Sequence, residues 1–227
     1  MNRTYTADTI ILDCDSTLTT IEGIDELARR AGVHGELAPL TDAAMAGAMR
    51  LEDVYSKRLD LIQPSRADID WLGNEYVRCL LPGAGRVISV LQSCHKQVHI
   101  VSSGIRQAVL VLAGTLGIES GFVHAVDLEF DNAGRYKGYD EDSPLVLSEG
   151  KKTVCRSIIG NTHSAVLVGD GITDLEAVQE RVAVIGFGGI VNRQAVRNRA
   201  ADFITTPSLE PLLERVLTRE ELARAGK

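Results

Sequence analysis

The short apolar run Thr9–Leu12 ends in two aspartates one residue apart, Asp13 and Asp15, and hydroxyl residues follow them. Such a run predicts a buried strand, and the carboxyl ends of strands are where open α/β sheets bind ligands. Two carboxylates this close repel each other unless a cation or a proton lies between them. The run therefore predicts a ligand site that holds either a metal ion or a shared proton.

Further apolar runs alternate with segments of helical periodicity along much of the chain. This alternation predicts parallel βαβ units, and hence an α/β fold with a doubly wound parallel sheet of the Rossmann-like kind. The expected strands are Thr9–Leu12, Val98–Val101, Ala165–Val168, Val182–Ile185 and Asp202–Ile204, and the expected helices are Gly85–Cys94, Arg106–Leu116, Lys151–Ile159 and Asp174–Glu180.

Residues 22–80 differ from this pattern, because they are helical in periodicity and contain no convincing strand. Within them, Ser65 can cap a helix that follows at Arg66–Tyr76. We expect a small helical cap domain at 22–80, inserted after the first strand of a core that is formed by residues 1–21 and 81–227.

The stretch Phe122–Phe130 alternates apolar and polar side chains, and Asp131–Gly134 and Arg135–Tyr139 follow it. Alternation on both sides of a turn that contains Asn and Gly predicts a β-hairpin. Beyond it, we expect a C-terminal helical segment from Leu209 onward.

The formal net charge of −7 makes the chain a poor general binder of nucleic acids or of anionic membranes. No run approaches the ~20 apolar residues of a membrane span, and the first six residues lack an apolar signal core. The four cysteines form no C-x-x-C pair, which favours reduced thiols over disulfides or a zinc site. We therefore expect a cytoplasmic protein that binds neither nucleic acid nor membrane.

Four groups of polar residues follow predicted strands or open a predicted helix. In a doubly wound sheet these positions lie along one edge, so their side chains would converge on a single crevice. Carboxylate oxygens are ligands that Mg²⁺ prefers, and serine and lysine are residue types that contact phosphate. The four groups are Asp13-x-Asp15-Ser16-Thr17, Ser102-Ser103-Gly104, Lys151 and Gly169-Asp170-Gly171-Ile172-Thr173-Asp174.

Each group has an ordinary structural alternative when it is taken alone. The two aspartates of the first could be a helix cap or a turn, and Ser102-Ser103-Gly104 could be a loop that caps a helix. Lys151 could be a solvated side chain, and Lys152 beside it competes for any role. The complete set in this order is far rarer by chance than any one group.

Three other ligand-binding motifs are excluded. An EF-hand loop starting at Asp13 would have Leu18 where Gly is required and Ile24 where Glu is required. A dinucleotide fingerprint starting at Gly169 would end in Asp174 instead of Gly, and Asp170 in its turn would repel a pyrophosphate. The chain also contains no G-x-x-x-x-G-K-[ST] run, which argues against a P-loop kinase.

The ordered set resembles the haloacid dehalogenase superfamily of Mg²⁺-dependent aspartyl phosphatases, whose hallmarks are D-x-D-x-T, a hydroxyl residue, a lysine and G-D-x-x-x-D. The resemblance covers nearly the whole chain and is closest to the phosphoserine phosphatase family. Segments that match this family include Glu22–Ala28, Arg58–Arg66 and Ile185–Gly189. The chain departs from it at Ser103 and Ala46, which add side-chain bulk where the family commonly has glycine.

The resemblance implies a catalytic pair, Asp13 as the nucleophile and Asp15 as the general acid and base. It implies Mg²⁺ held by Asp13, by Asp15 through its backbone carbonyl, and by Asp170. In the same way it implies that Asp174 supports the site by orienting Lys151 or metal-bound water.

The resemblance also implies a set of substrate-binding residues. A phosphorylated amino acid carries an ammonium that suits Glu22 and a carboxylate that suits the guanidinium of Arg58. Without the resemblance, Glu22 could be an acid at a helix N-terminus, and Arg58 the partner of a surface acid such as Asp53. The implied set is Glu22, Met45, Arg58, Ser102, Ser103, Gly104, Lys151 and Thr173.

We therefore expect an enzyme of serine biosynthesis that hydrolyses O-phospho-L-serine to L-serine and phosphate through an aspartyl-phosphate. A related phosphatase or phosphotransferase that acts on another small phosphorylated metabolite is the alternative, because of the two departures. A catalytically silent binding module is a third hypothesis, against which the intact acidic residues argue. The expected partner is a small phosphorylated amino acid, and the protein is expected to be a monomer or a homodimer.

Overall fold

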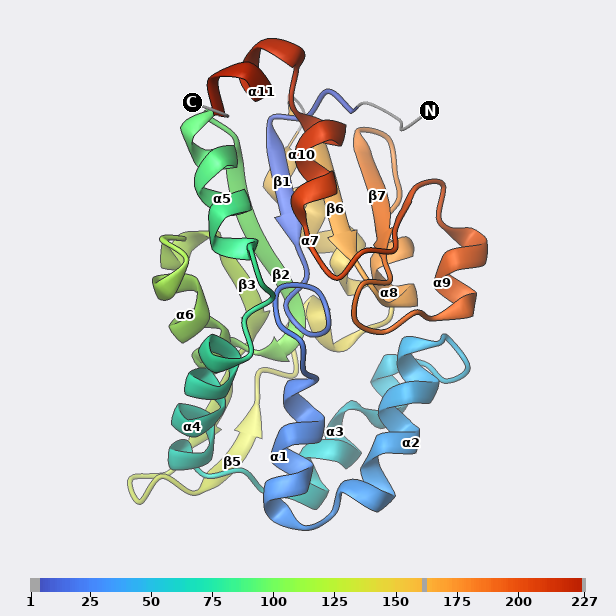
Figure 1. The fold of residues 1–227 in the computed structure, drawn as a ribbon. Coiled ribbons are helices and arrows are strands. Elements are labelled where there is room, and N and C mark those ends of the chain that lie inside the picture. Colours follow the sequence, from blue (N-terminus) through green and yellow to red (C-terminus); the bar gives the residue numbers. More distant parts are fainter. Residues whose placement is uncertain (1–4, 161–162, 226–227) are drawn as a thin grey trace.

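The computed structural model describes residues 5–160 and 163–225. Its centre is a six-stranded sheet in the order β3-β2-β1-β6-β7-β8, in which every pair of neighbours is parallel. Figure 1 shows this sheet in the upper part of the molecule. The strands are β1 (Thr9–Leu12), β2 (Gln97–Ile105), β3 (Val123–Val126), β6 (Ala165–Gly169), β7 (Val182–Phe187) and β8 (Phe203–Ile204).

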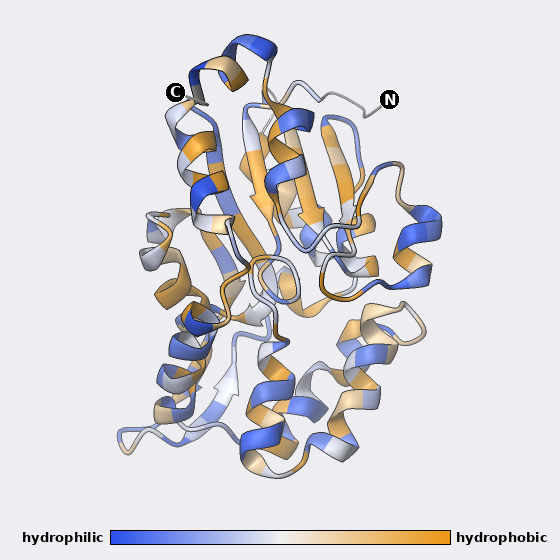
Figure 2. Cartoon of the chain, viewed as in Figure 1, coloured by the Kyte–Doolittle hydropathy of each residue, from blue (hydrophilic) through white to orange (hydrophobic). Residues whose placement is uncertain are grey.

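The central strands are mostly apolar, as is usual for strands covered on both faces. All four residues of β1 are buried, and so are all five of β6. In Figure 2, which colours residues by hydropathy, these strands are mostly orange. Ile11 of β1 lies opposite His99 of β2 and Leu167 of β6. The strands β1 and β6 therefore end side by side, while β2 continues past them. The residues that follow β1 and β6 and the last residues of β2 meet at one edge of the sheet. The doubly wound parallel α/β fold is confirmed.

Helices cover both faces of the sheet. In Figure 1, α5 and α10 lie beside each other in front of it, and α7 lies behind it. The helices of this part are α5 (Ala84–Ser93), α6 (Arg106–Thr115), α7 (Gly150–Ile159), α8 (Ile172–Leu175), α9 (Gln194–Arg199), α10 (Glu210–Val216) and α11 (Arg219–Ala225).

The segment between β1 and α5 forms four helices that lie across the carboxyl edge of the sheet (Figure 1). The last of them begins with a capping box, in which the Ser65 hydroxyl and the Asp68 carboxylate each accept a hydrogen bond from the other's backbone N–H. We call this segment the helical lobe; its assignment as a separate domain at 22–80 stays a prediction. Its helices are α1 (Gly23–Ala31), α2 (His34–Met45), α3 (Leu51–Ile62) and α4 (Arg66–Arg78).

The predicted hairpin is wrong in its first arm, because Phe122–Phe130 is not one strand. Its first half is β3, which joins the parallel sheet, and only β4 (Leu128–Phe130) pairs in antiparallel fashion with β5 (Tyr136–Tyr139). The side-chain amide of Gln107 bonds both the N–H and the C=O of Leu128, at 3.2 and 2.8 Å. These bonds satisfy the backbone where the chain leaves one sheet for the other.

Two further element boundaries differ from expectation. The helix predicted at Asp174–Glu180 is the single turn α8, because the backbone of Gln179 already pairs with Val182 at the start of β7. The strand predicted at Val98–Val101 extends to Ile105, with an irregular register against β3 beyond Val101. Sequence periodicity does not record such pairings between segments.

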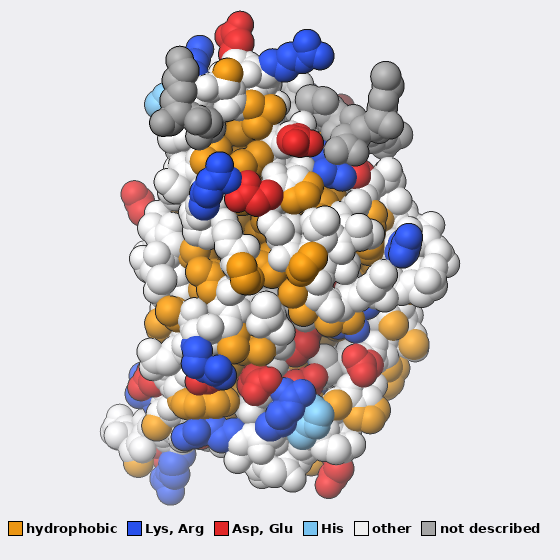
Figure 3. Space-filling model, in the orientation of Figure 1, with side chains coloured by type: hydrophobic (Ala, Val, Ile, Leu, Met, Phe, Trp, Pro, Cys, Tyr) orange, Lys and Arg blue, Asp and Glu red, His pale blue; other side chains and the backbone are white. Residues whose placement is uncertain are grey.

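The described residues contain no helix that is both long enough and apolar enough to cross a lipid bilayer. On the face drawn in Figure 3, acidic and basic side chains lie beside one another over the helical lobe and do not separate into fields of one sign.

Candidate active site

The polar groups expected at the edge of the sheet converge on one cavity. Its wall contains residues that follow β1, residues of β2 and α7, and the turn between β6 and α8, while the helical lobe closes the opposite side. The wall includes every expected site residue except Asp174, namely Asp13, Asp15, Glu22, Met45, Arg58, Ser102, Ser103, Gly104, Lys151, Asp170 and Thr173.

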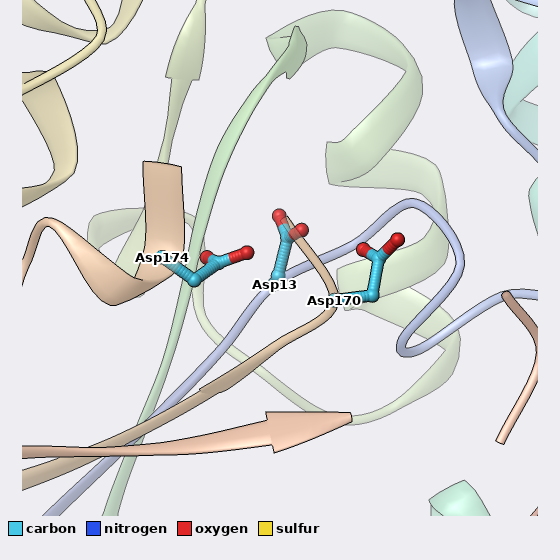
Figure 4. Close-up of side chains that lie close together, drawn as sticks. All are labelled: Asp13, Asp170 and Asp174. Atoms are coloured by element: carbon cyan, nitrogen blue, oxygen red, sulfur yellow. The ribbon is translucent and has the colours of Figure 1, made fainter. Parts of the chain in front are cut away.

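A cluster of three buried carboxylates lies at the sheet edge. Asp13, Asp170 and Asp174 each offer an oxygen within 4.8 Å of the others, and Figure 4 shows Asp13 between the other two. Burial, together with repulsion from Asp174 and Asp170, raises the pKa of Asp13 well above its usual range. Burial is also the main cause that raises the pKa of Asp170 to about 6. The cluster can hold a divalent cation that prefers oxygen ligands.

Lys151 supplies a positive charge to this cluster from the first turn of α7. Its Nζ lies 2.8 Å from Asp13 Oδ1 and 2.6 Å from Asp174 Oδ1, and its side chain is buried. Burial opposes its charge, but Asp13 and Asp174 raise its pKa above the usual range. Lys152, the competitor at the sequence level, is only partly buried and does not line the cavity.

The carboxylate of Asp15 is held apart from the cluster. Its Oδ1 accepts hydrogen bonds from the backbone N–H of Gly23 at 2.6 Å and from the Tyr76 hydroxyl at 2.8 Å. Burial raises the pKa of Asp15, while these two bonds lower it. A side chain at Gly104 would place its Cβ 2.9 Å from Asp15 Oδ2, so this carboxylate would have to move to admit it.

Ser102 lies in the irregular part of β2, and its buried Oγ accepts a hydrogen bond of 2.9 Å from the N–H of Gly104. The carbonyl oxygen of Ser103 accepts a hydrogen bond from the Tyr55 hydroxyl at 3.0 Å. The β2 strand thus presents a serine and a close-packed backbone to the cavity and is tied to α3 of the helical lobe.

The helical lobe contributes a buried guanidinium. Arg58 is only 5% exposed, and among the described residues it forms no ion pair and no hydrogen bond. Its guanidinium stacks over the Tyr55 ring at 5.4 Å, and burial lowers its pKa. A buried cation without a partner costs several kcal/mol, so this arrangement is typical of a site that receives an anion.

Three polar residues of the site were not expected from the sequence, Tyr55, Tyr76 and Arg193. Arg193 bonds Asp170 at 3.1 Å and Glu22 at 3.2 Å, and Tyr76 bonds Asp15. Arg193 follows the glycine-rich run Gly186–Gly189, which comes directly after the strand predicted at Val182–Ile185. That position predicts the same sheet edge, so the sequence could have indicated Arg193 as a site residue. Tyr55 and Tyr76 offered no such signal, since their helix positions alone do not show which element they face.

The cavity between the sheet edge and the helical lobe is small, about 50 Å³. Ordinary sites for small molecules enclose ~300–1,000 Å³. As the structure stands, the cavity is smaller than the space that a bound metabolite would fill.

Comparison with known proteins agrees with this geometry. The family model of the haloacid dehalogenase-like hydrolases matches residues 7–180. A phosphoserine phosphatase of Mus musculus is 41% identical over 88% of this chain and 89% of its own length, and the one of Homo sapiens is 40% identical over 88% and 90%. The Arabidopsis thaliana chloroplastic phosphoserine phosphatase is 33% identical, covering 85% of this chain and 67% of its own length.

Solved structures agree in fold. One described as a phospho-aspartyl intermediate analogue of phosphoserine phosphatase has a TM-score of 0.78 and 26% identity, and the match covers 94% of this chain and all of that one. A phosphoserine phosphohydrolase-like protein of Francisella tularensis has a TM-score of 0.80 over 96% of this chain and 98% of its own, at 21% identity.

Proposed function

Because this chain belongs to the haloacid dehalogenase-like hydrolases, we propose that it hydrolyses O-phospho-L-serine to L-serine and phosphate. The relatives named above carry that activity in their names, at about 40% identity over most of the chain. The reaction would pass through an aspartyl-phosphate, the species whose analogue one similar structure holds. The expected substrate is therefore a small phosphorylated amino acid.

One observation carries the choice of substrate, the unpaired guanidinium of Arg58 in the same cavity wall as Glu22. Phosphoserine has a carboxylate that can pair with this guanidinium and an ammonium that can pair with Glu22. Its phosphate would then face the sheet edge, where Asp13 and Lys151 lie. A sugar phosphate has neither the carboxylate nor the ammonium of phosphoserine, so it would leave Arg58 buried and unpaired.

In the first step, Asp13 would attack phosphorus and form the aspartyl-phosphate while the bond to the serine Oγ breaks. Asp15 would give its proton to that departing oxygen, which a carboxylic acid with a raised pKa can do near neutral pH. In the second step, Asp15 would take a proton from water as the water attacks phosphorus, and the Asp13–phosphate bond would break. Phosphate leaves, and both aspartates return to their starting states.

The residues of the carboxylate cluster fit a divalent cation, because they are buried, all offer oxygen, and repel one another without one. We expect Mg²⁺ held by the carboxylates of Asp13 and Asp170 and by the backbone carbonyl of Asp15. When bound, the ion would offset repulsion between the Asp13 carboxylate and the phosphate. Asp174 would hold Lys151 from behind, as their 2.6 Å bond suggests.

The remaining wall would bind the phosphoryl group. Ser102 can donate its hydroxyl to a phosphoryl oxygen, and Lys151 adds positive charge. Thr173 of α8 also lines this cavity, and Ser103 and Gly104 complete the surface along β2. Met45 would close the cavity from α2.

Substrate preference tests the proposal. The wild-type protein should release phosphate from L-phosphoserine with a higher kcat/KM than from D-phosphoserine, phosphothreonine or a sugar phosphate. Asp13→Asn should remain folded by circular dichroism and release none, because an amide cannot act as the nucleophile. A preference for the sugar phosphate would favour a related phosphatase with another substrate. No release from any compound would favour a silent binding module.

Serine added as an acceptor separates hydrolysis from group transfer. If labelled L-serine is converted to phosphoserine faster than phosphate is released, the protein is a phosphotransferase and the hydrolytic assignment is wrong. We expect phosphate release to dominate at every serine concentration, with exchange as a minor activity.

A further inference from the structure

Arg193 connects three carboxylates from three separate parts of the chain. Its Nε lies 3.1 Å from Asp170 at the sheet edge, its Nη2 lies 3.2 Å from Glu22 at the start of α1, and its Nη1 lies 3.5 Å from Asp42 of α2. The Arg193 side chain is only 8% exposed, whereas that of Asp42 is 77% exposed. The buried contacts to Glu22 and Asp170 are therefore the ones that matter energetically.

The two contacts of Glu22 fall on one of its oxygens. Oε1 accepts from the Ser16 hydroxyl at 2.8 Å and from Arg193 Nη2 at 3.2 Å. No donor among the described residues reaches Oε2, and Glu22 lines the cavity. One carboxylate oxygen is thus anchored and the other is left for a ligand.

Arg193 itself is not part of the cavity wall, although both of its buried partners are. Its guanidinium bonds these two wall residues without lining the cavity. Any effect of Arg193 on a ligand in the cavity would therefore pass through these carboxylates. Because Asp170 belongs to the sheet edge and Glu22 to the helical lobe, the same side chain also joins the two parts.

We propose that Arg193 is a positioning residue for ammonium recognition, which ties Glu22 of the helical lobe to Asp170 of the sheet edge and keeps the free oxygen of Glu22 facing the cavity. The role in recognition rests on the proposed function, since it assumes a substrate with an ammonium. The anchoring itself does not. A planar guanidinium can bond both carboxylates at once, whereas a lysine ammonium in its place would reach only one well.

Kinetics on two substrates test the recognition role. Arg193→Gln should lower the ratio of kcat/KM for L-phosphoserine to that for an aryl phosphate by about tenfold, because only the former has an ammonium. The change should appear mainly in KM, and Arg193→Lys should recover part of it. Arg199→Gln is the matched control, since Arg199 of α9 forms an exposed pair with Glu176. Arg199→Gln should change neither the ratio of kcat/KM values nor the KM for L-phosphoserine.

A double-mutant cycle with Glu22→Gln shows whether Arg193 acts through Glu22. In the Glu22→Gln background, Arg193→Gln should lower the ratio by less than about twofold. A full tenfold loss in that background would mean that Arg193 acts on the substrate or through Asp170, and would overturn the proposal. An equal loss on both substrates would overturn it as well.

Hydrogen exchange tests the anchoring without any turnover. In the substrate-free protein, Arg193→Gln should speed amide exchange in Gly23–Ala31 more than in Thr9–Leu12, and Arg199→Gln should leave both unchanged. Unchanged exchange in Gly23–Ala31 would refute the anchor. If the wild-type protein failed to hydrolyse phosphoserine, the proposed function would fall, and this measurement would still decide the anchoring.

Discussion

At the scale of single residues, the site is a set of buried charges in which each member depends on its neighbours. Lys151 partly compensates Asp13 and Asp174, and Arg193 compensates Asp170 and Glu22. Buried charges are costly unless they are paired, and in this cavity Arg58 lacks a partner. We propose that the ligand's own charge completes the set at this unpaired member.

The unpaired guanidinium of Arg58 predicts that this residue contributes to substrate specificity. Arg58→Ala should raise KM for L-phosphoserine by about 100-fold, since a charge-assisted bond to a carboxylate is worth ~1.5–3 kcal/mol. The same variant should change KM for an aryl phosphate less than about threefold. Lys57→Ala, on the same helix but exposed, serves as the control. Steady-state kinetics on both substrates check this, and equal losses on both would contradict the assigned contact.

At the scale of elements, the chemistry depends on where short turns and helix starts place side chains. Lys151 reaches the cluster because α7 begins one residue before it, pressed against the η2 turn (Pro144–Val146). At Gly150, an added Cβ would lie 1.7 Å from the carbonyl oxygen of Pro144. The close approach of two backbones therefore sets the position of the lysine.

Gly150→Ala should destabilise the protein by about 3 kcal/mol and reduce kcat, because either α7 or the turn must move. Gly114→Ala is the matched control, since an added Cβ in α6 meets nothing within 4 Å. It should stabilise the protein by about 0.5–1 kcal/mol through helix propensity. Urea denaturation and phosphate release measure both effects. A Gly150→Ala variant as stable and active as the wild type would show that the η2 turn can move at little energetic cost.

At the scale of the whole molecule, a parallel sheet collects residues from distant parts of the chain at one edge, and the helical lobe covers them. Burial, with repulsion from Asp174, raises the pKa values of Asp13 and Asp170 there, which is a cost in the metal-free protein. A bound cation would relieve that cost and so stabilise the native state.

Mg²⁺ at about 100 times its dissociation constant should raise Tm by about 5–10 °C, corresponding to ~2.7 kcal/mol of binding linkage. Asp170→Asn should remove most of the increase, and Asp42→Asn, at an exposed position, should keep it. Thermal melts in EDTA and in MgCl₂ measure the difference. An equal increase in the Asp170→Asn protein would place the ion elsewhere.

Two histidines form a pair of titratable groups away from the site, on the neighbouring strands β2 and β3. His99 Nδ1 and His124 Nε2 are 3.1 Å apart, and burial, followed by the charge of His124, lowers the pKa of His99 to about 4. The unfolded chain, with a histidine pKa near 6.5, binds more protons between about pH 4 and 6.5. Stability from this pair is therefore complete above that window and is lost as the pH falls through it.

Lowering the pH from 7.5 to 5.5 should cost the wild type about 1 kcal/mol more than His99→Phe, which removes the titrating ring. The raised pKa values of the buried carboxylates have the opposite effect, because they favour the native state at low pH. The wild type and His99→Phe both contain these carboxylates, so their effect cancels in the comparison. Tm measured at the two pH values gives the difference. The same pH dependence in His99→Phe would exclude the pair as its source.

Much of this molecule was accessible from the sequence because periodicity and strand-end residues are local signals. The apolar run before Asp13, the glycines around Asp170 and the helix start at Lys151 predict both the parallel sheet and the edge where the site lies. The family resemblance extended this to Glu22 and Arg58, which the structure brings to the same cavity.

Only the tertiary structure decided which charges meet and which stay alone. The division of Phe122–Phe130 between two sheets, the contact of Tyr76 with Asp15 and the bridge from Arg193 to Glu22 join residues far apart in the chain. A side chain's partner across such a distance depends on packing and desolvation, and neither leaves a periodic trace in the sequence. For the same reason, the sequence alone could identify Arg58 as a candidate but could not show that it is buried and unpaired.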